Sequence, residues 1–283
     1  MIRQRTDLQL SVTPVRTKYW RPGDDFLEII LRSIAGECRD GDIVVLSEKA
    51  LSVATGHLVD EKRANPGGLA RALVRIWMRI VWGRLLGRLC HLNKRTIRRL
   101  KQYPSRYGEL HKETVLVYAS LWDALLFYSE GGIDVTNLPY SLAALPLPDP
   151  TNIAERVRRE IIAASGKQLT VMIVDTDMTY SSNGIHITPR PNAIRGIIRL
   201  GIVAIILGRA FRWKARATPL AVQGEKLSVE TALTLAEFAD KVRGYGAGRT
   251  VWDMSRRFNV GLGSVTWEML DRVRHYPIVL VRA

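Results

Sequence analysis

The sequence predicts an α+β protein. Short apolar runs typical of buried strands are mixed with longer stretches of helical period, without the regular strand-helix alternation of a doubly wound sheet. Hydrophobic residues make up 47% of the 283 residues, enough to build a core, so disorder is excluded as the main state. A chain of this length allows one large domain or two smaller lobes.

Strands are predicted where apolar residues alternate with polar ones or cluster over a few positions. Leu8, Leu10 and Val12 alternate with polar neighbours and predict a first strand that ends near Pro14. The wholly apolar run 43–46 predicts a second, buried strand. Further strands are expected at 114–119, 124–128, 169–174, 194–207, 227–231 and, near the end of the chain, 278–281, with a polar excursion over 178–193.

Helices are predicted from end signals and from helical spacing. The acidic pair Asp24-Asp25 suits the positive end of a helix that runs through Ile34. Asp149 is a capping residue followed by the favoured first-turn Pro150, so a helix should run from there to about Ala164. Other helices are expected over 69–100, which the glycines at 83 and 87 can divide, after 231 as far as 242, and over 249–258 and 264–273.

The composition limits the classes of partner and the compartment. Lys and Arg total 42 against 27 Asp and Glu, a net charge of +15, which favours nucleotides, phosphorylated cofactors, nucleic acid or an acidic membrane face. Cys38 and Cys90 lack the spacing of a zinc site, and a reducing interior fits. The N-terminus has no apolar core of signal-peptide length, and no clean apolar run is long enough to span a bilayer. We therefore expect a soluble, cytoplasmic protein.

Two acidic motifs carry the strongest chemical signal, because each stands where a predicted strand ends. Asp134 lies in GGIDVTN, and Asp175-Thr176-Asp177 follows the strand 169–174. Carboxylates and a hydroxyl on rigid supports are the oxygen ligands that a phosphate-bridging divalent ion needs. The alternative is that these are turn-forming residues that hydrogen-bond their own backbone. The five histidines are scattered, and a surface or internally satisfied histidine is expected at each.

An ordered set of sequence blocks resembles the coenzyme F420 gamma-glutamyl ligase family. The similarity touches most of the chain in the family's order and approximate spacing, with two apparent insertions near 178–196 and 243–274. The order and spacing of the whole set carry the resemblance. The blocks are GDIVVLSEKALSVATG (41–56), GGIDVTN (131–137), LPLPDPTNIAERVRREI (145–161), VMIVDTD (171–177), GIVAIILG (201–208), GEKLSVETALTLAEFA (224–239) and YPIVLVR (276–282).

The resemblance implies a fold, a reaction and a set of site residues. The fold would be two-lobed, with mixed and antiparallel sheets, flanking helices and an intertwined homodimer. The reaction would join an acceptor carboxylate to an amino acid through a gamma-glutamyl-type amide bond, with GTP as a substrate, an acyl phosphate as intermediate and Mg²⁺ or Mn²⁺ as cofactor. Asp134, Asp175 and Thr176 would hold the metal, and the two aspartates would be catalytic. The implied nucleotide contacts are Thr17, Lys18, Tyr19, Trp20, Glu48, Lys49 and Asn137.

The chain departs from the family pattern around the implied substrate contacts. Val53 stands where the family has a lysine, Thr55 where it has a glutamate and His57 where it has an arginine. The family continues with Gly-Arg after the Asp-Thr pair, and this chain has Asp177-Met178. These departures fit a relative with an altered substrate, and they also fit a chain that is no longer a ligase.

A basic stretch supports an alternative from another functional class. Arginines recur at mostly four-residue steps through the predicted helix 69–100, among aliphatic and tryptophan residues. The favoured interpretation is a helix that packs an apolar face and exposes a solvated arginine stripe. A nucleic-acid surface or a membrane-surface helix would show the same pattern. The rival function is therefore a non-catalytic or regulatory protein that binds nucleic acid or other anions on a ligase-derived scaffold.

Overall fold

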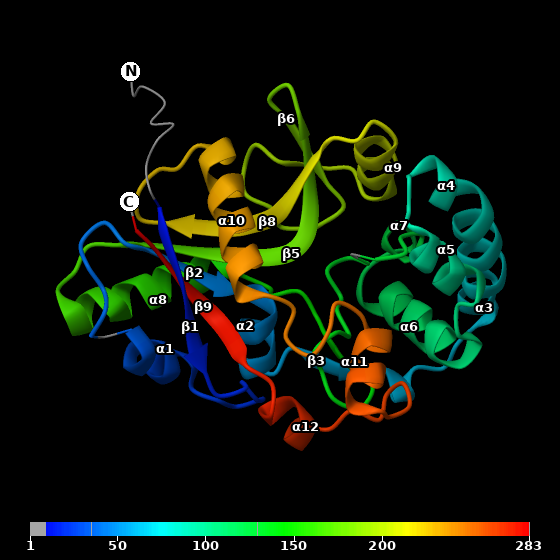
Figure 1. Cartoon of the computed structure of the whole chain (residues 1–283), viewed down its shortest axis with the longest axis horizontal. Helices are drawn as coiled ribbons and strands as arrows, with labels where there is room; N and C mark the ends of the chain where they lie inside the picture. The colour runs from blue at the N-terminus through cyan, green and yellow to red at the C-terminus, as the bar shows by residue number, and fades with distance from the viewer. Residues whose placement is uncertain (1–9, 35, 129, 283) are drawn as a thin grey trace.

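A mixed sheet forms the centre of the computed structural model, which describes residues 10–34, 36–128 and 130–282 and confirms the predicted α+β fold (Figure 1). The strand order is β1-β9-β2-β5-β6-β7, and β8 also pairs with β5. β2 pairs with β5 and β6 with β7 in parallel, whereas the other pairs are antiparallel. The strands are β1 (Ser11–Thr17), β2 (Ile43–Ser47), β5 (Thr170–Ser182), β6 (Ile185–Thr188), β7 (Ile198–Arg199), β8 (Lys214–Gln223) and β9 (His275–Arg282), with β3 (Leu58–Asp60) and β4 (Leu142–Ala144) in a separate two-stranded sheet.

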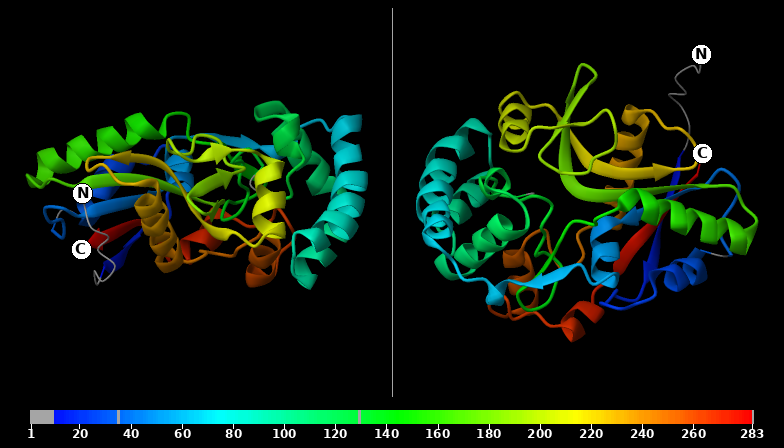
Figure 2. Two further views of the ribbon diagram at one scale, coloured as in Figure 1. Left: turned by 90° about the horizontal axis from the view of Figure 1, so that it is seen from above. Right: turned by 180° about the vertical axis from the view of Figure 1, so that it is seen from behind.

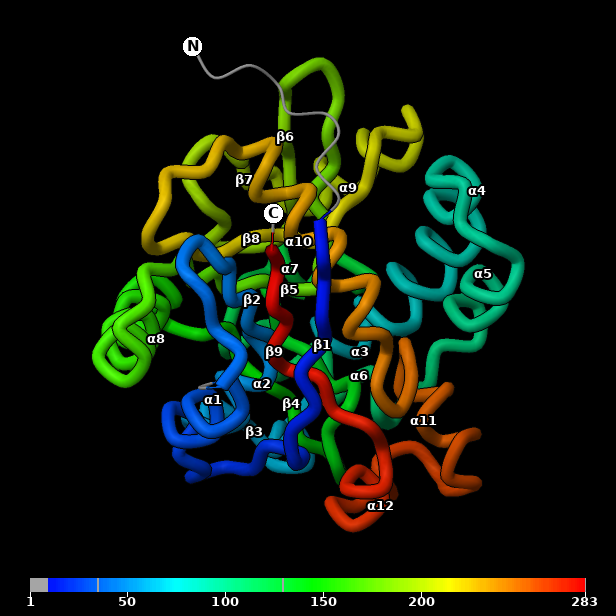
Figure 3. Tube along the Cα trace, turned by 60° about the vertical axis from the view of Figure 1, so that its left-hand side comes forward, coloured from blue at the N-terminus to red at the C-terminus, as the bar shows by residue number. Residues whose placement is uncertain are grey.

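Helices cover both faces of this sheet, as Figure 2 shows. α1 (Phe26–Ile34) and α8 (Pro150–Ser165) cover one face, where Val44 and Val171 belong to their apolar cluster. α10 (Val229–Arg243) covers the other face, where the cluster contains Val45 and Met172. Neighbouring strand residues thus alternate between two buried faces, which explains why the central strands are apolar throughout. Figure 3 shows β1 beside β9, and Ser11 pairs with Arg282, so the two ends of the described chain meet.

A helical region packs beside the sheet, on the right of Figure 1. One continuous helix comprises α3 (Gly68–Ala72), a π-helix (Leu73–Leu86) and α4 (Gly87–Leu89). Val74, Met78 and Trp82 bury one side of it in a cluster that also contains Tyr180 from the far end of β5. The neighbouring helices are α5 (Lys94–Lys101), α6 (Ser105–Tyr118), α7 (Leu121–Ala124) and α9 (Ile202–Ala210). The remaining helices are α2 (Glu48–Ala54), the 3-10 turn Glu61–Arg63, α11 (Val251–Phe258) and α12 (Trp267–Asp271).

The predictions based on buried strands and on helix end signals are confirmed. The apolar run 43–46 forms β2, the run 278–281 lies within β9, and the helices at 26–34 and after Asp149 are present. Asp149 accepts a hydrogen bond from the backbone amide of Asn152, as a capping residue does. The first strand continues past Pro14, because β1 is an edge strand and an edge tolerates a residue without an N–H. Leu8 lies outside the described residues.

Several strand predictions made from apolar runs are wrong. Residues 114–118 belong to α6, where Thr114 and Val115 are buried while Val117 is exposed, so helical packing overrides the preference of branched residues for strands. Residues 121–124 form α7, residues 202–210 form α9, and α10 begins at Val229. The excursion predicted at 178–193 is the end of β5 followed by β6. In the described residues, no helix is long and apolar enough to cross a membrane.

Candidate functional site

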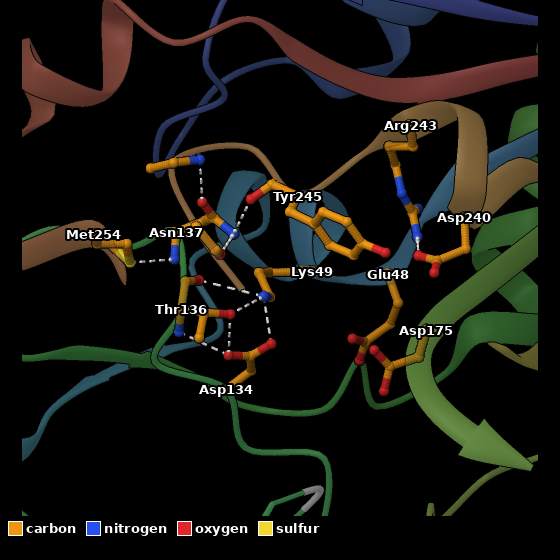
Figure 4. A network of polar contacts seen from close by, with 12 residues as sticks. Glu48, Lys49, Asp134, Thr136, Asn137, Asp175, Asp240, Arg243, Tyr245 and Met254 are labelled. Atoms are coloured by element: carbon orange, nitrogen blue, oxygen red, sulfur yellow. Dashed lines mark hydrogen bonds and ion pairs between the residues drawn. The ribbon is translucent and has the colours of Figure 1, made fainter. Parts of the chain in front are cut away.

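The site residues lie at the edge of the sheet where β2 ends beside β5, a strand that continues past Asp175 as far as Ser182. Ser47 at the end of β2 pairs with Val174 on β5, so the next residues, Glu48 and Asp175, lie side by side (Figure 4). The pairing of β5 with β8 shifts register between Asp175 and Met178. A bulge of this kind re-aims side chains and often lies beside an active site. The GGID loop reaches the same edge, because Asp134 is ion-paired with Lys49, the residue after Glu48.

Asp134 forms a small polar network with Lys49 and Thr136, drawn in Figure 4. The Lys49 ammonium is ion-paired with Asp134, and it donates to Thr136 Oγ1 at 2.8 Å. Asp134 Oδ1 also accepts from the backbone amide and the hydroxyl of Thr136, both at 2.7 Å. Burial raises the pKa of Asp134, but Lys49 and Thr136 outweigh burial and hold that pKa below its usual value. Asp134 is therefore a carboxylate that already has a cation partner.

Glu48 and Asp175 share a second cation, the guanidinium of Arg190. Arg190 Nη2 lies 2.8 Å from Glu48 Oε1, and Arg190 Nε lies 2.6 Å from Asp175 Oδ2, an ion pair whose N–H is not aligned for a hydrogen bond. Glu48 Oε1 also accepts from the backbone amide of Leu147 at 2.7 Å. Burial raises the pKa of Glu48 to about 7, although Arg190 opposes that rise. Glu48 and Asp175 thus share one buried arginine.

Asn137 fixes the turn that follows α10. Its amide nitrogen donates to the carbonyls of Gly248 at 3.2 Å and Tyr245 at 3.3 Å, and its amide oxygen accepts from the backbone amide of Ala247 at 2.6 Å. Tyr19 donates its hydroxyl proton to the Asn137 carbonyl at 2.6 Å. The polar atoms of the Asn137 side chain are therefore all engaged within the chain, and in this arrangement Asn137 holds the turn at 245–248 in place.

Two cavities meet at this edge. The larger has a volume of about 570 Å³, within the range of small-molecule sites, and Asp134 lies in its wall. The smaller has a volume of about 90 Å³ and is bordered by Asp175. Lys49, Asn137 and Thr176 line both, together with Gly244 and Tyr245. A ligand group that lies between the cavities would therefore contact the Lys49 ammonium and the Thr176 hydroxyl.

The implied nucleotide contacts in the N-terminal segment divide into two groups. Tyr19 and Trp20 are buried and line the smaller cavity, where Tyr19 stacks on His275 with ring centres 4.4 Å apart. Burial lowers the pKa of His275 to about 4, so this histidine is neutral near pH 7. Thr17 and Lys18 line neither cavity, and Lys18 forms a surface ion pair with Asp24 at 2.6 Å. Glu48 lies just behind the cavity wall and lines neither.

The three predicted metal ligands do not form a ready metal site. Within residues 10–34, 36–128 and 130–282, no group of three or more His, Cys, Asp and Glu side chains is arranged to hold a metal ion. The oxygen donors of Asp134, Asp175 and Thr176 are of a kind that divalent ions bind. However, the Asp134 carboxylate is already ion-paired with Lys49, and the Asp175 carboxylate with Arg190. This arrangement does not fit a resident divalent ion held by the three residues together. Metal binding by these residues stays a prediction.

Two groups at the site were not predicted from the sequence. Arg190 stands alone between two prolines, in a stretch that gave no local signal of function. The wall of the larger cavity also carries His111, ion-paired with Glu61 and Glu130, and Lys112 behind it is paired with Glu130. His111 thus agrees with the expectation of an internally satisfied histidine. The residues of each group are far apart in the sequence, so no local sequence pattern could show that they come together in the fold.

Comparison with known proteins gives three matches. The family model described as F420-0:Gamma-glutamyl ligase matches residues 14–246. An uncharacterized protein of Methanocaldococcus jannaschii is 34% identical over 283 residues, which covers 95% of each chain. The coenzyme F420:L-glutamate ligase of Archaeoglobus fulgidus is 26% identical over 168 residues, 58% of this chain and 59% of that enzyme.

Proposed function

Because the chain belongs to the F420-0:gamma-glutamyl ligase family, we propose that it is a ligase that joins a small-molecule acid to an amino acid through an amide bond at the expense of GTP. The observation that carries this proposal is the meeting of two cavities at Lys49, Asn137 and Thr176. A phosphoryl donor in one cavity and a carboxylate acceptor in the other would meet beside the Lys49 ammonium. A fixed cation at that point offsets negative charge on a transferring phosphoryl group.

The proposed reaction has two steps. The acceptor carboxylate attacks the terminal phosphorus of GTP, which forms an acyl phosphate and releases GDP. The amine of the amino acid then attacks the acyl carbon, loses a proton and expels inorganic phosphate, which leaves the amide. Lys49 would bind and orient the phosphoryl oxygens, and Asn137 would hold the turn at 245–248 over the smaller cavity. Mg²⁺ or Mn²⁺ is predicted to accompany the nucleotide phosphates, and a cytoplasmic homodimer remains the predicted working form.

The acceptor is proposed to differ from the deazaflavin precursor of coenzyme F420. Val53 lines the smaller cavity and Met178 the larger, and each replaces a residue of the family pattern. An apolar side chain in place of a cation removes a contact for an anionic group. An assay with GTP, glutamate and the F420 precursor should therefore give little amide product, whereas rapid turnover would show that these departures are harmless.

Replacing Lys49 tests the role of the shared cavity wall. Lys49→Met should lower amide formation from GTP by about 100-fold or more, because removing one preorganised charge partner costs that much in comparable sites. Amide product and GDP would be measured by mass spectrometry over a panel of small carboxylic acids with glutamate. The matched control is Lys167→Met, since Lys167 is an exposed residue paired with Asp40, lines neither cavity and should leave turnover unchanged. Equal loss in both variants, or turnover undiminished in Lys49→Met, would remove the support for this site.

A further inference from the structure

Arg190 places a buried positive charge at the edge of the sheet where the family resemblance implies a metal. Its guanidinium is paired with Glu48 at 2.8 Å and with Asp175 at 2.6 Å, and its side chain is only 1% exposed. Arg190 Nη1 also donates to the carbonyl of Gly131 at 3.3 Å. One guanidinium therefore contacts oxygen atoms from three chain segments that are far apart in sequence, as a bound cation would.

The GGID loop is shaped around this guanidinium. Gly132 has a φ of +81°, and a Cβ at that position would lie 1.4 Å from Arg190 Nη1. Glycine is thus required both by its backbone conformation and by the approach of the arginine. At the other end of the side chain, the backbone amide of Arg190 donates to Thr188 Oγ1 at 3.1 Å, and Thr188 is fully buried at the end of β6. The arginine is therefore held at both ends.

Lys49 gives Asp134 an equivalent partner. Its ammonium is paired with Asp134, and it also donates to the Thr136 carbonyl at 3.2 Å. The two aspartates of the implied metal set are thus each neutralised by a different side chain of the same chain. The Lys49–Asp134 pair is partly exposed, whereas Arg190 is buried. A buried charge that loses its partner is strongly destabilised, so the Arg190 guanidinium is not readily displaced by an ion from solution.

We infer that Arg190 is a built-in counter-ion that takes the place of a divalent cation between Glu48 and Asp175, so that the free protein binds no divalent metal there. A metal ion could enter only if the guanidinium left a buried position where it has three oxygen partners. The inference concerns binding alone, and it stands whether or not the proposed ligase reaction is found.

Mn²⁺ titration of the full-length protein, followed by electron paramagnetic resonance, tests the inference. Wild type should bind no stoichiometric Mn²⁺ in the absence of nucleotide. Arg190→Ala leaves Glu48, Asp175 and the Gly131 carbonyl facing one gap, and oxygen atoms are the donors that hard divalent ions prefer. This variant should gain one Mn²⁺ per chain that wild type does not bind. Its lowered Tm should rise with Mn²⁺, because a ligand of the native state stabilises it.

A second buried arginine provides the matched control. Arg216 is also 1% exposed, and it pairs at 2.5 Å with Glu230 of α10. Arg216→Ala should lose stability without gaining a metal site, and adding Glu48→Gln to Arg190→Ala should abolish the gain. A folded Arg190→Ala that gains no Mn²⁺ binding would overturn the inference.

If Arg190→Ala does not fold, wild type and Asp175→Asn decide the question. Equally weak Mn²⁺ binding by both supports the built-in counter-ion. One Mn²⁺ per wild-type chain that Asp175→Asn loses would overturn it.

Discussion

At the residue scale, His111 is held between two carboxylates in the wall of the larger cavity. Its Nδ1 lies 2.5 Å from Glu61 Oε1, and its Nε2 pairs with Glu130. Burial lowers the pKa of His111, but Glu130 and Glu61 outweigh burial and raise that pKa to about 10. Burial alone would raise the pKa of Glu130. The charges of Lys112 and His111 outweigh burial and lower that pKa to about 2. His111 is therefore an imidazolium around neutral pH, and it donates from both ring nitrogens.

A pH dependence of stability follows from this imidazolium. Between about pH 6.5 and about pH 10 the folded chain holds a proton on His111 that the unfolded chain releases, so this contribution to stability falls as pH rises. Urea unfolding over a pH series should show that His111→Gln removes a decline on the order of a few kcal/mol. Burial lowers the pKa of Lys112, so the contribution of Lys112 to stability rises with pH. The test is therefore the difference in slope between wild type and His111→Gln.

An exposed histidine provides the control for this comparison. His91 lies at an exposed position after α4, and His91→Gln should leave the slope of stability against pH unchanged. Parallel curves for wild type and His111→Gln would contradict the assigned charge of His111.

At the element scale, the helix Gly68–Leu89 differs from the amphipathic helix expected from its sequence. Its exposed side carries arginines and aliphatic residues together, and Ile76 is 57% and Leu85 64% exposed. The central part is a π-helix, whose hydrogen bonds run from i to i+5 and widen the turn. Residues four or five positions apart therefore line up, and aliphatic side chains that a regular α-helix would turn inward face outward. The prediction of a solvated arginine stripe is therefore incomplete, because aliphatic side chains are exposed on the same side of the helix.

Two arginines in this helix should differ in their contribution to stability. Arg79 donates to the Tyr103 carbonyl at 2.6 and 3.0 Å and to Ser105 Oγ at 2.9 Å, whereas Arg75 is 62% exposed and lies 3.4 Å from Glu109. Arg79→Ala should cost about 1 to 3 kcal/mol, because it leaves a carbonyl without its charged donor. Arg75→Ala should stay within about 0.5 kcal/mol. Urea unfolding measures both, and equal costs would show that the Arg79 contacts contribute nothing.

At the scale of the whole molecule, several large apolar side chains remain exposed on the described surface. Val117 is 65%, Trp122 68% and Phe211 69% exposed. Transfer of such side chains from water into an interface between chains would be favourable. The predicted homodimer would give such residues a partner, and sedimentation velocity should then yield twice the mass of one chain. A dimer built on apolar contacts should persist at high salt, which screens contacts between charges. A monomer at all concentrations would remove this prediction.

The sequence by itself determined the elements whose signals are local. The wholly apolar run 43–46 requires a strand buried on both faces, and Asp149-Pro150 starts α8, because a cap and a fixed φ act within one helical turn. The same local reasoning placed Asp134 and Asp175 at the ends of apolar runs, and the structure brings both to the place where β2 ends, although Asp175 lies within β5 and not after it. An ordered set of such blocks was enough to identify the family.

Only the tertiary structure decided how the charges at that edge are paired. Arg190 lies 142 residues from Glu48 in the chain, and Lys49 lies 87 residues from Thr136. No periodicity spans such separations, since local patterns reflect the hydrogen bonding and packing of one element. The helical identity of residues 114–118 likewise depends on which face α6 buries. Whether an acidic motif meets a metal ion or an arginine depends on which distant segment the fold brings beside it, and here that segment carries Arg190.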